Sequence, residues 1–310
     1  MSAPVLDARG VTVDFARRGG LSRVVHGLDL VLERGAVTVL LGESGSGKTV
    51  FAKSIVGMAP TGARVGGTSR FSGGLDLIAA GRARLRPLHG SVVSAIAQDP
   101  SAALDPMRRI AGQLRETLVQ HRPGMSRADI DARGRELLDL VGLHDHDRVL
   151  RSYPHQLSGG MRQRIAIAIA VSCEPELLVA DEPSSALDAS VGARIVDLLG
   201  ELRERLGTAI LFITHDIGVA ARIASRETDQ VAVLLSGRLM ESGPAAEVWA
   251  APAHPYTRAL IGAEPSAEVP RGELPTVPAW MRDHDDWGPL DPVGPGHLAR
   301  AVAVHEGAGA

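Results

Sequence analysis

The segment Gly42-Glu43-Ser44-Gly45-Ser46-Gly47-Lys48-Thr49 decides how the rest of the chain is interpreted. It follows an apolar run, residues 36–41, which predicts a buried strand. It precedes a segment with apolar residues at helical spacing, namely Val50, Phe51, Ala52, Ile55 and Val56. Glycines between a buried strand and a helix are typical of a P-loop. A glycine-rich turn that arose by chance is the alternative, and the flanking strand and helix argue against it.

The residue types of this segment suit a bound phosphate chain. Its glycines let the backbone turn its N–H groups, and the positive end of the following helix, toward an anion. Lys48 is expected to reach the β- and γ-phosphate oxygens, and the Thr49 hydroxyl to take one position on Mg²⁺. The sequence therefore predicts nucleotide binding by Gly42, Glu43, Ser44, Gly45, Ser46, Gly47, Lys48 and Thr49.

The composition is that of an ordinary globular protein. The 310 residues are 45% hydrophobic and 22% charged, which suffices for one large domain or two small ones. A net charge of -3 argues against a dedicated nucleic-acid binder. The single cysteine, Cys173, excludes an internal disulfide and a cysteine-based metal cage. No apolar run approaches the roughly 20 residues of a membrane span, so work at a membrane would need another chain as anchor.

The order of apolar runs predicts an α/β fold with two additions. Residues 5–40 alternate between short apolar runs and glycines, which predicts a small antiparallel β subdomain before the P-loop, whereas residues 62–74 are turn-rich. Residues 106–150 have helical spacing and many charges, with Ser126 as a cap and Gly142 as a stop. We interpret residues 104–158, approximately, as a helical subdomain inserted into the core.

The core resumes after this insertion. Strands are predicted at 91–97, 177–180, 209–213 and 231–235, and they alternate with helices at 159–172 and 191–206. This alternation predicts a parallel sheet with helices on both faces. Residues 1–262 then form the nucleotide-binding domain. Residues 263–310 are rich in Pro and Gly without periodicity, which predicts a loosely ordered tail.

Two acidic residues, Asp181 and Glu182, follow directly on the apolar run 177–180. A carboxylate at the C-terminal end of a parallel strand lies in the crevice where open α/β sheets bind ligands. Asp181 suits Mg²⁺, directly or through water, and Glu182 is placed to polarise an attacking water. The alternative is an acidic cap on the next helix; the P-loop upstream favours the catalytic interpretation.

The segment Leu157-Ser-Gly-Gly-Met-Arg-Gln-Arg164 begins a predicted helix. Its two glycines weaken the helix but expose the N–H groups of the first turn, as phosphate binding requires. Ser158 either caps this helix or contacts a γ-phosphate. By itself the segment is equally consistent with a plain helix start.

Taken together, the motifs resemble those of the nucleotide-binding subunits of ATP-binding cassette (ABC) transporters. The series is the P-loop, Gln98, Leu-Ser-Gly-Gly, Leu-Leu-Val-Ala-Asp-Glu-Pro, Ser185-Ala-Leu-Asp188 and Ile213-Thr-His-Asp216, and the resemblance covers residues 5–262. Three segments look like the dipeptide, oligopeptide and nickel import group: Gln98-Asp-Pro, the stretch from Tyr153 to Arg164, and His254-Pro-Tyr-Thr-Arg-Ala-Leu260.

The resemblance implies a catalytic role for several residues. Asp181 is expected to bind the metal, Glu182 to be the general base and His215 to contact the γ-phosphate. Gln98 is expected to sense Mg²⁺ and the transport state. Thr49, Gln98 and Asp181 together are the expected metal-site residues.

Other matching residues are expected to act between subunits or on the base. Ser158, Gly159 and Gly160 are expected to close over ATP held by the opposite subunit, and Asp188 to link the two sites across the dimer. Phe15 is the only aromatic residue before the P-loop and is therefore the candidate for stacking on adenine.

The implied function is the ATP-hydrolysing subunit of an ABC importer for di- or oligopeptides, with ATP and Mg²⁺ as cofactors. If Leu-Ser-Gly-Gly acts on ATP held elsewhere, one chain cannot close a site, so a second cassette, identical or paralogous, is expected head to tail. The other expected partners are permease subunits and, indirectly, an extracytoplasmic solute-binding protein, at the cytoplasmic face of the membrane; no nucleic acid is expected. Nickel or another small solute as cargo, an exporter, and a soluble ABC ATPase remain alternatives.

Overall fold

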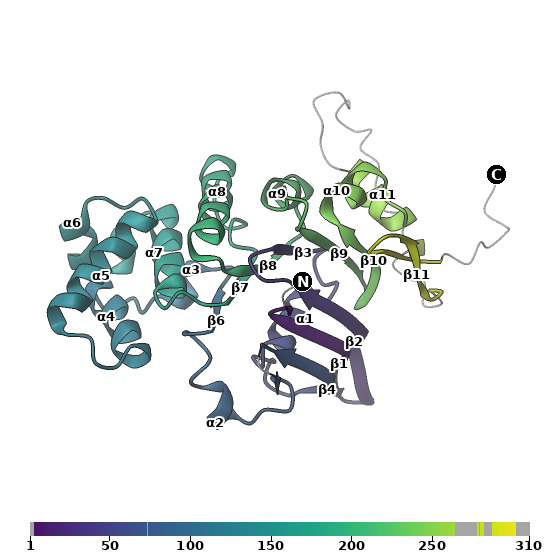
Figure 1. Ribbon diagram of the computed structural model, residues 1–310, viewed down its shortest axis with the longest axis horizontal. Helices are drawn as coiled ribbons and strands as arrows, with labels where there is room; N and C mark the ends of the chain where they lie inside the picture. The colour runs from purple at the N-terminus through teal and green to yellow at the C-terminus, as the bar shows by residue number, and fades with distance from the viewer. Residues whose placement is uncertain (1–2, 73, 264–277, 279, 282–286, 302–310) are drawn as a thin grey trace.

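The computed structural model describes residues 3–72, 74–263, 278, 280–281 and 287–301, and Figure 1 shows their arrangement. A small antiparallel sheet has the order β2-β1-β4-β5. Its strands are β1 (Leu6–Arg17), β2 (Gly20–Leu32), β4 (Ala63–Phe71) and β5 (Leu75–Asp76). The expected antiparallel β subdomain is therefore confirmed.

The strand β4 lies where the sequence indicated only turns, and that expectation is wrong. Its glycines are needed for close backbone approach: a Cβ at Gly67 would lie 2.6 Å from the carbonyl oxygens of Arg9 and Gly10. The register of β1 against β4 shifts at this place, between Arg9 and Thr12. Glycine inside a strand often marks such an irregularity or a close approach of another backbone.

The central sheet has eight strands in the order β11-β12-β10-β9-β3-β8-β7-β6. Five of them are mutually parallel: β9 (Gln230–Leu235), β3 (Val37–Leu41), β8 (Ala209–Thr214), β7 (Leu177–Asp181) and β6 (Val93–Ile96). The strand β10 (Arg238–Pro244) pairs antiparallel with β9. The predicted parallel sheet is confirmed, and the antiparallel strands at one edge make the complete sheet mixed.

The parallel strands are buried on both faces, which explains their unbroken apolar sequences. In β8, Ile210 and Phe212 pack into one core cluster, while Leu211 and Ile213 pack into another. The first cluster includes residues of the helices α7 (Gly159–Val171), α8 (Ala189–Leu206) and α9 (Ile217–Ile223). The second includes α1 (Lys48–Ile55) and the antiparallel sheet. Helices therefore cover one face, and α1 with the small sheet covers the other.

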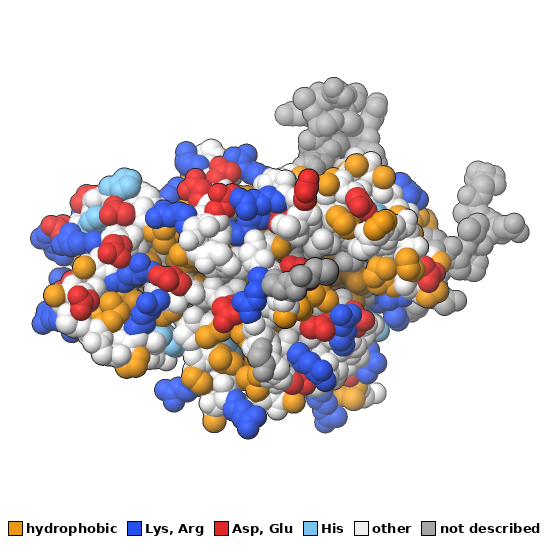
Figure 2. Space-filling view, viewed as in Figure 1, with side chains coloured by type: hydrophobic (Ala, Val, Ile, Leu, Met, Phe, Trp, Pro, Cys, Tyr) orange, Lys and Arg blue, Asp and Glu red, His pale blue; other side chains and the backbone are white. Residues whose placement is uncertain are grey.

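A group of helices lies at one end of the long axis of the molecule (Figure 1). It comprises α3 (Pro100–Ala103), α4 (Ile110–His121), α5 (Arg127–Leu140), α6 (His146–Arg151) and the 3₁₀ turn η1 (Pro154–Gln156). Ser126 caps α5 as predicted, because its hydroxyl accepts the Asp129 N–H at 3.2 Å. Figure 2 shows acidic and basic side chains intermixed over this end. The predicted helical segment is thus present, between β6 and α7.

Three shorter helices complete the described chain. The helix α2 (Arg82–Leu85) precedes β6, whereas α10 (Ala245–Ala250) and α11 (Pro255–Gly262) follow β10. Within the described ranges, no helix combines the length and apolar character that crossing a bilayer requires.

The C-terminal segment contains a β-hairpin, so the expectation of a loosely ordered tail is wrong for Leu290–Arg300. The hairpin consists of β11 (Leu290–Gly294) and β12 (His297–Arg300). β12 pairs antiparallel with β10, with Glu241 opposite Ala299. Such short strands carry little periodicity of their own, and they form because β10 offers an edge for pairing. Residues 264–277, 279, 282–286 and 302–310 of the predicted tail lie outside the described residues.

Candidate active site

Four neighbouring strands bring the predicted catalytic residues to one edge of the sheet. The P-loop follows β3, Gln98 lies two residues after β6, Asp181 ends β7 and His215 follows β8. These strands are adjacent and parallel, so their carboxyl ends lie together. Side chains from well-separated parts of the sequence therefore meet in one crevice, where open α/β sheets bind ligands.

The P-loop is held by close backbone contacts. A Cβ at Gly42 would lie 2.2 Å from the Leu234 carbonyl oxygen, so only glycine fits there. Gly47 is the N-cap of α1, with φ at +95°, and a Cβ there would lie 3.2 Å from the Val24 carbonyl oxygen. These contacts fix the loop between β9 and β2 and direct the N-terminus of α1 toward the crevice.

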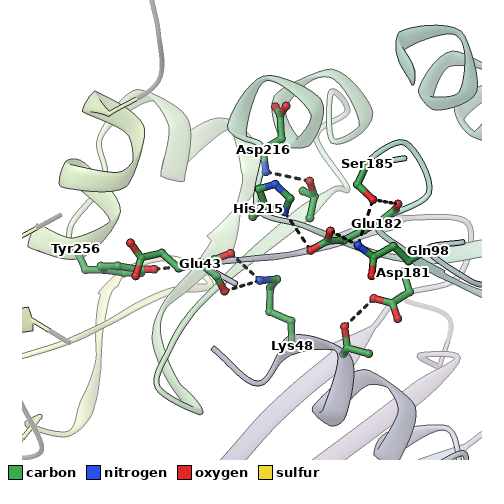
Figure 3. Close-up of polar contacts among 12 residues, drawn as sticks. Glu43, Lys48, Gln98, Asp181, Glu182, Ser185, His215, Asp216 and Tyr256 are labelled. Atoms are coloured by element: carbon green, nitrogen blue, oxygen red, sulfur yellow. Dashed lines mark hydrogen bonds and ion pairs between the residues drawn. The ribbon is translucent and has the colours of Figure 1, made fainter. Parts of the chain in front are cut away.

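Lys48 is buried at the centre of the loop. Its Nζ donates to the carbonyl oxygens of Gly42 at 2.6 Å and Glu43 at 2.8 Å (Figure 3). Burial lowers the pKa of Lys48, while the charges of Glu182, Asp181 and Glu43 oppose that shift. The ammonium group therefore lies within the field of the acidic residues on β7, although they are more than 130 positions away in the sequence.

Of the three predicted metal-site residues, Thr49 and Asp181 contact each other, whereas the Gln98 amide contacts Glu182 and Ser185. The Thr49 hydroxyl donates to Asp181 Oδ1 at 2.7 Å, and Lys53 Nζ lies 3.2 Å from Asp181 Oδ2. Asp181 is only 5% exposed, and a buried charge needs compensation. The Thr49 hydroxyl and the Lys53 ammonium group supply it. Lys53 was not among the predicted site residues. It lies four residues after Thr49, on the same face of the helix, and this spacing was the available signal.

Glu182 lies between His215 and Gln98 (Figure 3). Its Oε1 is 3.0 Å from His215 Nδ1, and its Oε2 accepts the Gln98 amide at 3.1 Å. The same amide lies 3.3 Å from the Ser185 hydroxyl, which the predicted site did not include. Glu182 has a φ of +46°, and its N–H donates to the Ile213 carbonyl. A non-glycine residue in this strained conformation is typical of a functional site.

The residues predicted to act on a second subunit lie at the starts of two helices, α7 and α8. Ser158 caps α7 by accepting the Met161 N–H at 3.3 Å, and Asp188 caps α8 by accepting the Val191 N–H at 2.9 Å. The two helix starts touch, since a Cβ at Gly160 would lie 2.7 Å from Val191 Cγ1. The Val191 N–H and the Ser190 hydroxyl lower the pKa of Asp188.

Phe15 lies near the end of β1 and is half-buried. It pairs with Ser22 of β2, two residues before Val24, whose carbonyl packs on Gly47 of the P-loop. The strand register thus brings Phe15 near the start of α1, and stacking on adenine stays a prediction.

The geometry fits a nucleotide with Mg²⁺. Buried Ser46 Oγ has no hydrogen-bond partner in the part of the chain that the structure describes, as expected of a donor reserved for a phosphate. Thr49 and Asp181 supply hard oxygen ligands of the kind that Mg²⁺ prefers. The P-loop, the pair Thr49 and Asp181, and the carboxylate of Glu182 together can hold a phosphate chain, a metal and an attacking water.

Comparisons with known proteins identify the family of this chain. The family model described as ABC transporter matches residues 25–185, and the chain belongs to this family. The fold and the P-loop define the class as an ABC-type ATP-binding cassette. A second family model, described as the C-terminal region of oligopeptide/dipeptide transporters, matches residues 240–286.

The similar relatives carry names of peptide transport proteins. The chain is 38% identical over 279 residues to a dipeptide transport ATP-binding protein of Lactococcus lactis subsp. cremoris, covering 90% of this chain and 79% of the relative. It is 39% identical over 274 residues to an oligopeptide transport ATP-binding protein of Salmonella typhimurium, covering 88% and 80%. Among solved structures, a dimeric ATP-binding cassette bound to ADP and Pi aligns with a TM-score of 0.67 at 26% identity, covering 77% of this chain and 98% of that one.

Proposed function

We propose that this chain is the ATP-hydrolysing subunit of an ABC importer that takes up di- or oligopeptides through a membrane permease. The contacts of Glu182 carry the catalytic part of the proposal: one carboxylate, at the end of β7, is held by His215 and Gln98 from the two flanking strands. The match of residues 240–286 to oligopeptide/dipeptide transporters, and the names of the relatives, support the peptide cargo.

In this proposal the P-loop holds the phosphates of ATP. The N–H groups of the loop and of the first turn of α1 bind phosphate oxygens, and the buried Ser46 hydroxyl donates to one of them. Lys48 exchanges the carbonyls of Gly42 and Glu43 for the β- and γ-phosphates, so its ammonium loses no hydrogen bond when the nucleotide enters. Phe15 stacks on the adenine.

Thr49, Asp181 and Gln98 are the residues that would hold Mg²⁺, which would neutralise negative charge on the phosphate chain. Glu182 accepts the proton of the attacking water. His215 contacts Glu182 Oε1, orients that carboxylate and contacts the γ-phosphate. Gln98 contacts Glu182 Oε2, so a change in the nucleotide state shifts the loop that contains Gln98. Because Gln98 leads into the helical subdomain, this loop passes the state of the nucleotide to the permease.

A second cassette completes each site. Ser158, Gly159 and Gly160 lie at the start of α7, and we assign them to ATP held by the partner cassette. Asp188 caps α8, whose start contacts the start of α7, and links the two sites. A similar solved structure, a dimeric ATP-binding cassette with ADP and Pi, supports a dimer of cassettes, and we propose that the two are arranged head to tail. The assembly lies at the cytoplasmic face of the membrane, and an extracytoplasmic solute-binding protein delivers the cargo to it.

Glu182→Gln tests the catalytic assignment. The variant should bind ATP as tightly as the wild type and hydrolyse it at least about 100-fold more slowly, because a positioned general base contributes that much. Glu204→Gln, which removes an exposed carboxylate from α8, is the matched control and should hydrolyse ATP normally. Unchanged hydrolysis in Glu182→Gln would rule out the general-base role.

The transport assignment has its own test. The tagged chain is isolated from gently solubilised membranes of its native host, and the co-purifying proteins are identified by mass spectrometry. Multi-span permease proteins and a second cassette support the proposal, and uptake assays with labelled peptides and with nickel then identify the cargo. Recovery of only nucleic-acid or ribosomal proteins would leave the ATPase and overturn the transport role.

A further inference from the structure

The helix α11 reaches the P-loop through Tyr256. This side chain is fully buried, and its hydroxyl accepts the Glu43 N–H at 3.3 Å. The carbonyl oxygen of Glu43 accepts a hydrogen bond from Lys48 Nζ at 2.8 Å. Glu43 is therefore held at both its N–H and its carbonyl (Figure 3). A segment that resembled only a family marker in the sequence thus contributes a contact to the phosphate loop.

Buried polar groups fix the position of Tyr256. His254 is the N-cap of α11, and its Nδ1 accepts the Tyr256 N–H at 3.1 Å. His254 is itself fully buried, and its ring lies 5.2 Å from that of Trp287. Burial lowers the pKa of His254 to about 4, so the imidazole is a neutral acceptor at neutral pH. This hydrogen bond fixes the first turn of α11, which carries Tyr256.

Glu241 connects this turn to the C-terminal hairpin. It lies on β10, is fully buried, and accepts the N–H groups of Ala253 at 2.8 Å and His254 at 2.9 Å. Its Oε1 also accepts His297 Nε2 of β12 at 2.7 Å. The His297 ring lies against Gly243, where a Cβ would be 2.8 Å from ring atom Cδ2. A buried carboxylate needs such donors, so losing one perturbs the whole group.

We propose that Tyr256 is a positioning residue of the nucleotide site, which holds the Glu43 peptide in the conformation that binds phosphate, and that Glu241 and His297 hold Tyr256 in place. The inference rests on the proposed nucleotide site of this chain. A loop that wraps around phosphates gains affinity when its conformation is fixed before the ligand arrives. Tyr256 supplies such a constraint from outside the loop, at the N–H group of Glu43.

Tyr256→Phe in the full chain tests the role of the hydroxyl. The variant keeps the buried ring and should bind ATP about fivefold more weakly, the effect of one net hydrogen bond. Its KM for ATP should rise by a similar factor while kcat changes less than about twofold, because the lost contact positions the loop before hydrolysis. Thr257→Val is the matched control: it removes the neighbouring buried hydroxyl, which has no partner within the described ranges, and should leave ATP affinity unchanged.

Two comparisons make the result decisive. Lys48→Ala should abolish ATP binding; if it does not, the proposed nucleotide site fails, whatever Tyr256→Phe shows. If Lys48→Ala abolishes binding and Tyr256→Phe binds ATP as the wild type does, only the positioning role fails. Melting temperatures of both variants separate a loss of affinity from a loss of folded protein.

His297→Ala tests the support from the hairpin. This variant should also weaken ATP binding. The double variant His297→Ala with Tyr256→Phe should bind ATP about as tightly as Tyr256→Phe alone, because both changes act through the Tyr256 hydroxyl. Independent effects that multiply in the double variant, or normal affinity in His297→Ala, would show that the hairpin does not position Tyr256.

Discussion

Lowering the pH should destabilise this protein through His254. Its imidazole is fully buried, Nδ1 accepts the Tyr256 N–H, and Nε2 has no partner in the described part of the chain. Burial lowers its pKa from 6.5 to about 4. The unfolded chain therefore binds a proton at a pH where the folded chain does not, and stability is lost as the pH falls from about 6.5 toward about 4.

The size of this effect follows from the two pKa values. The difference between the pKa of 6.5 in the unfolded chain and about 4 in the folded chain corresponds to about 3 kcal/mol of unfolding free energy. Each pKa unit contributes about 1.4 kcal/mol. Above about pH 6.5, His254 is neutral in both the folded and the unfolded chain, and its effect on stability disappears. Because one mutation typically changes stability by a similar amount, this single imidazole should be measurable in the acid sensitivity of the protein.

Equilibrium urea unfolding between about pH 4 and about pH 8 measures this term against the variant His254→Asn. Asparagine does not titrate, and its side-chain oxygen can accept the Tyr256 N–H as an N-cap. The difference in unfolding free energy between wild type and variant should be constant above about pH 7 and should move by about 3 kcal/mol against the wild type near pH 4. A difference that stays flat over this range would refute a buried, neutral His254.

Two further substitutions test packing around the sheet. Arg203→Met should cost about 3–5 kcal/mol in urea unfolding, because it leaves the fully buried carboxylate of Asp229, 2.7 Å from the Arg203 guanidinium, without its ionic partner. Gly42→Ala should cost about 1–3 kcal/mol or more and weaken ATP binding, because its Cβ would meet the Leu234 carbonyl oxygen at 2.2 Å and push the P-loop out of place.

Each has a control in the chain. Arg222→Met breaks an exposed pair with Asp197 and should change stability by less than about 1 kcal/mol; an equal cost for the two arginines would contradict the role of burial. Gly45→Ala also lies at positive φ, +82°, but in open space, so only backbone strain of about 1–2 kcal/mol is expected. If Gly45→Ala weakened ATP binding as much as Gly42→Ala, close approach to β9 would not be the reason.

Local sequence chemistry determined much of the fold. The glycines at 42, 45 and 47 between an apolar strand and a helix indicated the P-loop, and the uninterrupted apolar runs of β3, β7 and β8 indicated strands buried on both faces. Ser126 as a cap and Gly207 as a helix stop were also visible, and Gly207 has the left-handed conformation expected there, with φ at +66°. These features depend on neighbours within a few positions, so the sequence shows them directly.

The tertiary structure decided the contacts between distant segments. The glycines of β4 are consistent with turns in the sequence alone, and only the pairing of β1 with β4 shows that they belong to a strand. The hairpin β11–β12 forms because β10 offers an edge for pairing. Lys53, Ser185 and Tyr256 join the site through Asp181, Gln98 and Glu43. A polar side chain can be a solvated surface group or a partner in a buried network. Which of the two it is depends on its burial and on which strands are adjacent, and a local stretch of sequence shows neither.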